Sequence, residues 1–403
     1  MERSIRKWPA THCERPEDFP LKHGRRQSGT DCAPLGGRFA QMVNLSDLRI
    51  AFVAGTLGQG GAERQLYYNL RVLRQSGAQI KVYCLTRGEF WEEPIQALGV
   101  PVHWIGASSS RIRRLMSLWL ALRHSPVHIV QSQHFFVNAY AAVGARMTGA
   151  KSIGAVRSNG QVEYNELGNL GGRLSSQIPD ILAANSEYGL KAMLRLGVRD
   201  RKLFFLPNVT DTELFSPADN ICRTVGLKLL FVGQLEPKKR PDRFLRVVGK
   251  LLKKLSCTLI ADIYGEGTLA TSLTKEAEDL KISSCIHWRG CRDNVISAYR
   301  DADCLLLTSD CEGTPNVVIE AMACGLPVVA TRVGGVPEVV QEGVTGYLFE
   351  PDNEAGMAKT LVDLAQNPLL RLQMGRNARQ RVIEKHSLEA LPKHLRNLYS
   401  RVS

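Results

Sequence analysis

The chain has 403 residues, a length at which two domains are commoner than a single hydrophobic core. Hydrophobic residues make up 44%, as in ordinary globular proteins, and no apolar run reaches the roughly 18 residues that span a bilayer. The net charge is +13, of which residues 42–225 carry +7, from 20 basic and 13 acidic residues. No nucleic-acid-binding motif accompanies this charge, so an anionic membrane surface or an acidic or lipid-phosphate acceptor fits it better.

Residues 1–41 are rich in Arg, Pro, Gly, His and Gln and show no periodicity, which predicts a disordered extension. Met42 directly precedes the first apolar stretch of the chain. We therefore interpret residues 1–41 as the result of a start codon assigned too far upstream, rather than as a regulatory or targeting arm. No apolar h-region of a secretory signal is present. The ten cysteines include no Cys-x2-Cys pair, which is typical of reduced thiols and predicts a cytoplasmic protein.

From Leu48 onward, short apolar runs alternate with amphipathic stretches. The first series predicts strands at 49–54, 79–85, 102–105, 128–131, 152–156, 181–183 and 203–206. The predicted helices between them span 62–75, 93–98, 111–122, 139–148 and 187–196. Residues 207–217 have the composition of a linker.

A second series follows the link. It predicts strands at 228–232, 257–264, 286–288, 304–308 and 328–330, with helices at 240–254, 268–280 and 388–401. Repeated strand–helix units imply parallel sheets covered by helices on both faces. The sequence therefore predicts an α/β protein of two Rossmann-like, doubly wound domains, 42–208 and 227–386, with a linker at 209–226 and a final helical segment at 387–403. Ligands are expected in a central cleft, at the carboxyl ends of the strands.

Two carboxylates, Glu312 and Glu320, lie eight positions apart where a loop is expected to turn into a helix. Thr314 is predicted to be the N-cap and Pro315 the first helical residue, and Gly325 suits the position after the helix end. Glu312 then precedes the helix, and Glu320 lies two turns inside it.

Unpaired N–H groups at the start of this helix, from Asn316 to Val318, point toward the same space as Glu312. Such a helix end attracts phosphate through its donors and its partial positive charge. A carboxylate beside a phosphate site suits a ligand with hydroxyl groups as well as phosphates, and a sugar nucleotide is such a ligand.

The segment begins Glu-Gly-Thr-Pro-Asn at Glu312 and ends Glu-Ala-Met-Ala-Cys-Gly-Leu-Pro at Pro327. It resembles the Glu-x7-Glu motif of the retaining nucleotide-sugar glycosyltransferases of family 4, also called glycosyl transferases group 1, and the resemblance extends from Leu48 to the C-terminus. It implies a GT-B fold with an acceptor-side first domain, a donor-nucleotide second domain and a C-terminal helix that packs back on the first. It also implies that Glu320 holds the ribose, that Glu312 acts in catalysis on the donor sugar, and that the donor contacts Gly313, Asn316 and Val317.

A second motif follows the strand at 228–232 and contains Gln234, Lys238, Lys239 and Arg240. Family 4 members commonly carry Arg at the place of Gln234 and Lys at the place of Lys239. Those two cations hold the diphosphate and offset the charge on the leaving group. Because glutamine adds no charge, the resemblance assigns the catalytic cation to Lys239, keeps Gln234 in the donor site, and makes Lys238 or Arg240 the compensating cation.

The first domain contributes a glycine-rich loop after its first strand. Gly60 and Gly61 let the backbone approach the donor closely, and the resemblance places the adjacent Glu63 and Arg64 on the acceptor side. His134 follows the strand at 128–131 and is implied as a catalytic residue that contacts donor sugar or acceptor. A partly buried loop histidine is the structural alternative. Arg157 stands where family members often have a second histidine.

Two metal-like patterns are interpreted as structural, and no metal or other cofactor is expected. Asp301 and Asp303 precede a strand rather than follow one, which places them away from the ligand. His124 and His128 have metal-like spacing, but Pro126 breaks the helix that would bring both rings to one face.

The helix expected at 111–122 is basic at its ends and apolar within. It fits a core-facing helix, and it also fits a helix that lies on a membrane surface.

The resemblance thus implies a retaining glycosyltransferase that moves a sugar from a nucleoside diphosphate sugar to a glycan or lipid-linked acceptor. Synthesis of cell-surface polysaccharide or glycolipid is the expected setting, on the inner face of the membrane. The expected partners are the nucleotide sugar, the acceptor and an anionic membrane surface, and not nucleic acid. Two alternatives remain: a sugar-nucleotide epimerase of the same two-domain fold, and a sugar-nucleotide-binding protein that Gln234 makes catalytically weak.

Overall fold

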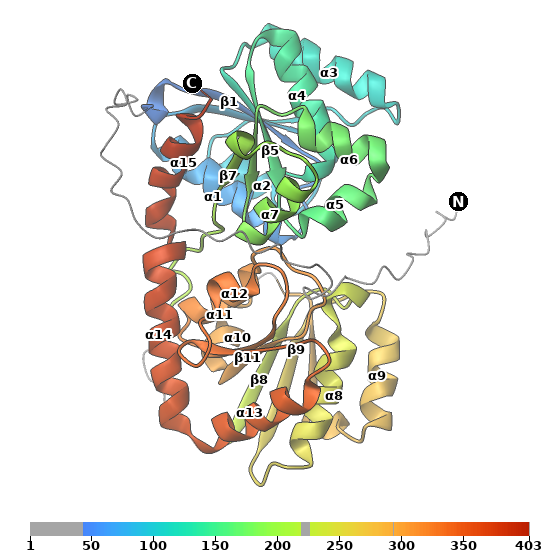
Figure 1. The fold of residues 1–403 in the computed structure, drawn as a ribbon, viewed down its shortest axis with the longest axis vertical. Coiled ribbons are helices and arrows are strands. Elements are labelled where there is room, and N and C mark those ends of the chain that lie inside the picture. The colour runs from blue at the N-terminus through green and yellow to red at the C-terminus, as the bar shows by residue number, and fades with distance from the viewer. Residues whose placement is uncertain (1–42, 219–225, 293, 403) are drawn as a thin grey trace, which may run out of the picture. The chain divides into compact units, whose positions relative to one another are not determined.

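The computed structural model describes residues 43–218, 226–292 and 294–402 (Figure 1). The predicted extension at 1–41 and part of the predicted linker lie outside the described residues. No helix among the described residues is both long and apolar enough to cross a bilayer.

The first sheet has seven parallel strands in the order β3-β2-β1-β4-β5-β6-β7. Their bounds are β1 Arg49–Ala54, β2 Gln79–Cys84, β3 Val102–Trp104, β4 Ile129–Ser132, β5 Lys151–Val156, β6 Ile181–Ala184 and β7 Leu203–Phe205. The helices of this part are α1 Gly61–Gln75, α2 Glu92–Ala97, α3 Arg111–His124, α4 Asn138–Thr148, α5 Gly160–Glu166, α6 Gly168–Gln177 and α7 Glu187–Arg195.

The second sheet has six parallel strands in the order β10-β9-β8-β11-β12-β13. Their bounds are β8 Leu227–Val232, β9 Leu259–Tyr264, β10 Ile286–Gly290, β11 Cys304–Leu307, β12 Val328–Thr331 and β13 Gly346–Phe349. The later helices are α8 Pro241–Leu252, α9 Ala270–Asp279, α10 Ile296–Asp301, α11 Asn316–Ala323, α12 Val336–Val339, α13 Glu354–Gln366, α14 Pro368–His386 and α15 Leu391–Tyr399.

Apolar cores cover both faces of each sheet, which confirms the predicted pair of doubly wound domains. In the first sheet, alternate residues of β1 serve opposite cores: Phe52 packs with α1, and Val53 packs with Leu118 and Leu122 of α3. The C-terminal helix α15 contributes Leu395 and Leu398 to the core on the α1 side, so the end of the chain completes the first sheet's packing.

The strand orders place a topological switch point between β1 and β4 in the first sheet and between β8 and β11 in the second. At such a point the connections leave on opposite faces, and the carboxyl ends of the strands leave room for a ligand. The loops after these four strands, together with the helices α1 and α11 that follow β1 and β11, contain all the predicted site residues except Arg157.

Several elements were not predicted. The sequence analysis missed β13 and the helices α5, α6, α10, α12, α13 and α14. The prediction for the start of α11 was wrong by one residue, because the helix begins at Asn316 with Pro315 as its N-cap. Thr314 does not cap it: its hydroxyl donates to the carbonyl of Asn185 at 2.6 Å. Gly325 follows the helix in the left-handed region, with φ of 76°, as predicted.

Candidate active site

Lys239 and Glu312 form the centre of the candidate site. Lys239 closes a single 3-10 turn, Pro237–Lys239, after β8, and Glu312 lies in the loop between β11 and α11. The Lys239 ammonium donates to Oε1 of Glu312 at 2.6 Å, and the Ser309 hydroxyl donates to the same oxygen at 2.6 Å. Glu312 is 6% exposed, so its charge is satisfied by a cation and a hydroxyl rather than by bulk water.

Glu320 lies in the second turn of α11 and is 2% exposed. The Arg64 guanidinium of α1 donates to its Oε1, and the Tyr299 hydroxyl of α10 donates to its Oε2 at 2.9 Å. The charge of Glu320 is the main cause that raises the pKa of Arg64, against the opposing effect of burial. Arg64 and Glu320, predicted on the acceptor side and in the donor site respectively, are therefore direct partners.

The N-terminus of α11 offers fewer main-chain donors than predicted. The N–H of Val318 donates to the carbonyl of Pro315 at 3.2 Å. Among the described residues, the N–H groups of Asn316 and Val317 have no recorded acceptor, because they are the first two of the helix. The predicted phosphate-binding donors reduce to these two amides.

The Asn316 side chain does not point to a ligand but joins segments distant in the chain. Its Nδ2 donates to the carbonyl of Gly61 at 2.8 Å, and its Oδ1 accepts from Gln65 at 3.2 Å and from Asn208 at 2.9 Å. A Cβ on Gly61 would lie 2.7 Å from this amide nitrogen, so Gly61 is needed for packing. Gly60 is the N-cap of α1. Gly61 therefore lets the start of α1 contact α11, whereas a Cβ on Gly60 would meet the side chain of Glu63.

Of the cations near Gln234, some form ion pairs with aspartates and others are exposed to solvent. Gln234 is exposed after β8, with no recorded side-chain hydrogen bond in the described part of the chain. Arg240 is engaged, because its guanidinium bonds to Asp242 at 2.8 Å and to Asp310 at 2.9 Å. Of the two cations predicted to compensate for Gln234, Lys238 is the exposed one.

His134 is held in one tautomer by its neighbours. Its Nδ1 accepts from the N–H of Gly55 at 3.2 Å, so the ring proton is on Nε2, which donates to Glu63 at 3.1 Å. Thr56 also donates to Glu63, at 2.6 Å. Burial would raise the pKa of Glu63, but the hydrogen bonds from His134 and Thr56 outweigh it, so the pKa is lowered.

Arg157 lies after β5 with an incompletely satisfied guanidinium. Its Nε and Nη2 are buried with no hydrogen-bond partner among the described residues, and burial lowers its pKa to about 10. Burial also raises the pKa of Glu163 to about 7, although this carboxylate accepts from the N–H of Arg157 at 3.3 Å. The Arg157 carbonyl would lie 2.7 Å from a Cβ on Gly313, so Gly313 lets the loop before α11 pack against this strand end.

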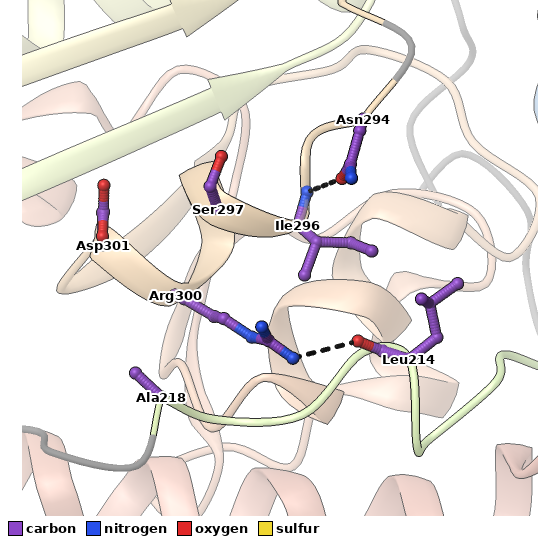
Figure 2. A pocket seen from close by; sticks show the side chains of 7 residues that line it. All are labelled: Leu214, Ala218, Asn294, Ile296, Ser297, Arg300 and Asp301. Carbon is purple, nitrogen blue, oxygen red and sulfur yellow. Dashed lines mark hydrogen bonds between the residues drawn. The ribbon is translucent and has the colours of Figure 1, made fainter.

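The aspartates of the metal-like pattern lie elsewhere. Asp303 accepts from the N–H of Lys228 at 2.8 Å, at the amino end of β11, whereas Glu312 follows its carboxyl end. Asp301 lines a pocket of about 430 Å³ together with Arg300, whose guanidinium bonds to the Leu214 carbonyl at 3.3 Å (Figure 2). No cluster of three metal-ligating side chains occurs in the described part of the chain.

Two residues of this region were missed by the sequence analysis. Tyr299 binds Glu320 from a helix that lacks a clear periodic signal. Glu338 of α12 accepts from the N–H groups of Glu187 and Tyr188 at the start of α7, at 2.8 Å each, and Ser186 caps the third at 3.0 Å. The Glu338 contacts join residues at least 150 positions apart, and no local pattern marks either residue.

Comparison with known families gives two matches that together cover most of the chain. The model for glycosyl transferases group 1 matches residues 223–381, and that for Glycosyltransferase Family 4 matches residues 59–214. The N-acetyl-alpha-D-glucosaminyl L-malate synthase of Bacillus anthracis is 31% identical over 171 residues, 42% of this chain and 44% of the relative. The D-inositol 3-phosphate glycosyltransferase of Mycolicibacterium vanbaalenii is 31% identical over 210 residues, 47% of this chain and 46% of the relative. The matched part thus spans less than half the length of these two relatives.

Solved structures resemble a larger part of the chain. Anabaena Alr3699/HepE in complex with UDP-glucose covers 88% of this chain and is itself covered completely, with a TM-score of 0.76 and 16% identity. A variant of S. aureus TarM, in complex with fondaparinux, alpha-GlcNAc-glycerol and UDP, covers 87%, with a TM-score of 0.75 and 14% identity. This likeness and the two parallel sheets confirm the predicted GT-B fold. With one family model over residues 59–214 and the other over residues 223–381, the chain belongs to the family 4 glycosyltransferases of the GT-B fold.

Proposed function

We propose that this chain is a glycosyltransferase that moves a sugar from a nucleoside diphosphate sugar to an acceptor, with retention of configuration. The observation that carries the proposal is the pairing of Lys239 with Glu312 beside the first two amides of α11. A cation and main-chain donors suit a diphosphate, and a carboxylate suits sugar hydroxyls. The HepE structure, which contains UDP-glucose, supports a nucleotide-sugar donor.

In this proposal Lys239 and the amides of Asn316 and Val317 offset the negative charge that grows on the diphosphate as the bond to the sugar breaks. Glu312 binds hydroxyls of the donor sugar and stabilises the positive charge that develops on its ring. Glu320 accepts hydrogen bonds from the ribose hydroxyls. The cation is part of the chain, so no metal or other cofactor is required.

The acceptor side of the proposal rests on the ends of the first sheet. The His134–Glu63 pair and the buried guanidinium of Arg157 supply polar groups there. We take the acceptor to be a glycan or a lipid-linked sugar used in cell-surface polysaccharide or glycolipid synthesis at the cytoplasmic face of the membrane. The relatives' names supply two further acceptors for comparison, L-malate and D-inositol 3-phosphate.

A two-stage experiment tests the proposal. A thermal-shift screen of common nucleotide sugars identifies the donor, since a ligand at 100 times its dissociation constant stabilises by about 2.7 kcal/mol. Release of free nucleoside diphosphate is then measured with and without each acceptor, and NMR of the product gives the anomeric configuration. Release that depends on an acceptor, with the donor's configuration kept, supports the proposal. Isomerised nucleotide sugar without acceptor would instead identify an epimerase, and binding without turnover would identify a binding protein.

A further inference from the structure

Among the described residues, the outer face of α3 carries an exposed apolar stripe. Ile112, Met116 and Leu120 are 75%, 41% and 45% exposed. Their spacing of four residues places them one above another along the helix, which is roughly 21 Å long. The opposite face of the helix packs Leu118 and Leu122 into the core of the first sheet. The helix therefore has two apolar faces. One is buried in the core of the first sheet, and the other is exposed.

Exposed cations lie at both ends of the stripe. On α3 these are Arg111 and Arg113 in the first turn and Arg123 in the last turn, and Arg146 and Lys151, at the end of α4 and the start of β5, are also exposed. The guanidinium carbon of Arg123 lies 5.5 Å from the centre of the Trp119 ring. None of the ion pairs found in the described part of the chain includes Arg111, Arg113 or Arg123.

The sequence around this face contains no acidic residue. Residues 94–162 include seven lysines and arginines and neither aspartate nor glutamate. The whole net charge of +7 of residues 42–225 therefore equals the charge of this one segment. Surfaces that only need solubility commonly intersperse both signs of charge. A segment with seven cations and no carboxylate of its own favours attraction of its exposed face to an anionic surface.

We propose that the outer face of α3, defined by Ile112, Met116 and Leu120 with Arg111, Arg113 and Arg123, docks on an anionic lipid bilayer. The three apolar side chains enter the region between headgroups and acyl chains, and the arginines contact lipid phosphates. A nucleic acid would use the arginines but leave the apolar stripe in water. An acidic protein would not require three apolar side chains in line on a helix whose other face is already buried.

Vesicle co-sedimentation of the full chain tests the proposal. We expect binding to vesicles of equimolar phosphatidylglycerol and phosphatidylcholine at low salt, with at least a tenfold weaker apparent dissociation constant for phosphatidylcholine alone. Combined Ile112→Ser, Met116→Ser and Leu120→Ser should weaken binding to the anionic vesicles about tenfold or more. Combined Arg111→Gln, Arg113→Gln and Arg123→Gln should also weaken it and reduce its salt dependence. Neither set touches the residues of the candidate active site, and an unchanged melting temperature of the unliganded protein shows that the variants fold.

A matched control uses another exposed basic stretch of the first domain. Combined Arg195→Gln, Arg199→Gln and Arg201→Gln should leave vesicle binding within about twofold of the unaltered chain. These three arginines lie at and after the end of α7, and none of them is on α3. Equal losses for both arginine sets, or undiminished binding of the serine variant, would overturn the assignment to α3. A dimer of the unaltered chain in sedimentation velocity that the serine variant does not form would also overturn the assignment, because the face would then bind a second copy. The readout involves no sugar transfer, so it succeeds or fails independently of the proposed function.

Discussion

The Lys239 ammonium lies 2.6 Å from Oε1 of Glu312, so the cation expected at the diphosphate and the carboxylate expected at the sugar are hydrogen-bonded to each other. An ammonium has three donors, and this contact uses one of them. Lys239 can therefore bind Glu312 and a phosphate oxygen together. The pair defines where the bond between sugar and diphosphate would lie in the proposed reaction.

Lys239→Ala should lower kcat by roughly a hundredfold or more, with a smaller effect on donor binding. The charge that Lys239 offsets grows as the leaving group departs, so its contribution is larger in the transition state than in the ground state. Steady-state kinetics for nucleoside diphosphate release gives both parameters. Glu312→Gln should likewise act mainly on kcat.

The control for Lys239 is Lys254→Ala, because Lys254 is an exposed lysine after the end of α8 and is not part of the candidate site. It should change kcat by no more than a few-fold. Near-normal kinetics for Lys239→Ala and Glu312→Gln, in proteins with unchanged melting temperature, would remove the active site from this location.

Glu320→Gln should raise the KM for the donor and leave kcat within a few-fold, because ribose hydroxyls do not change during the reaction. It should also reduce the free energy of unfolding by roughly 1–3 kcal/mol, because Arg64 loses the carboxylate that satisfies its charge. Urea unfolding and donor saturation curves measure the two effects separately. In an Arg64→Gln and Glu320→Gln double variant, the loss of stability should be less than the sum of the single losses. Strict additivity would show that the pair contributes nothing to folding.

Gln234→Arg should tighten the binding of nucleoside diphosphate, because it places a second cation beside Lys239 where the exposed Gln234 contributes only an amide. The expected gain is about tenfold at low salt, and added salt should reduce it. Isothermal titration calorimetry measures the dissociation constants of both proteins. Gln234→Lys tests whether charge alone suffices, and an unchanged affinity in both variants would place the diphosphate away from β8.

Turnover should persist in excess EDTA, because Lys239 and the amides of Asn316 and Val317 supply the charge partners of the proposed diphosphate. The same assay with added Mg²⁺ or Mn²⁺ should give the same rate within about twofold. If EDTA abolished turnover and Mg²⁺ or Mn²⁺ restored it, the role of the metal-like pattern at Asp301 and Asp303 would be reopened.

Much of the fold could be predicted from the sequence because its strands are buried on both faces and form short continuous apolar runs. The bounds of β1 and β8, for example, were predicted to within one residue. The amphipathic stretches after Ala330 gave weaker signals: α14 carries charged residues around most of its circumference and was missed. In the candidate site, one motif pointed to Glu312 and Glu320 and a second to Lys239. Neither motif indicated that Lys239 pairs with Glu312 or that Arg64 pairs with Glu320. The Arg64–Glu320 and Asn316–Gly61 contacts join residues more than 250 positions apart, which no local pattern encodes.

His386 makes the stability of the fold depend on pH. It ends α14 where the chain returns toward the first sheet, is 6% exposed, and its Nδ1 bonds to the carbonyl of Asn208 at 2.9 Å. Because a carbonyl only accepts, Nδ1 carries the proton of a neutral ring. Burial is the main cause that lowers the pKa of His386 from 6.5 to about 4.

Between about pH 4 and pH 6.5 the unfolded chain therefore binds a proton at His386 that the folded chain does not. The free energy of unfolding should fall as pH falls through this window, by up to roughly 3 kcal/mol from this group. Urea unfolding across the window should show a shallower pH dependence for His386→Gln than for the unaltered chain, while the exposed His124→Gln serves as control. Burial also lowers the pKa of His394 on α15, so some of the same slope should remain in His386→Gln. An unchanged slope in His386→Gln would show that the folded chain accepts the proton at His386 without opening the contact to Asn208.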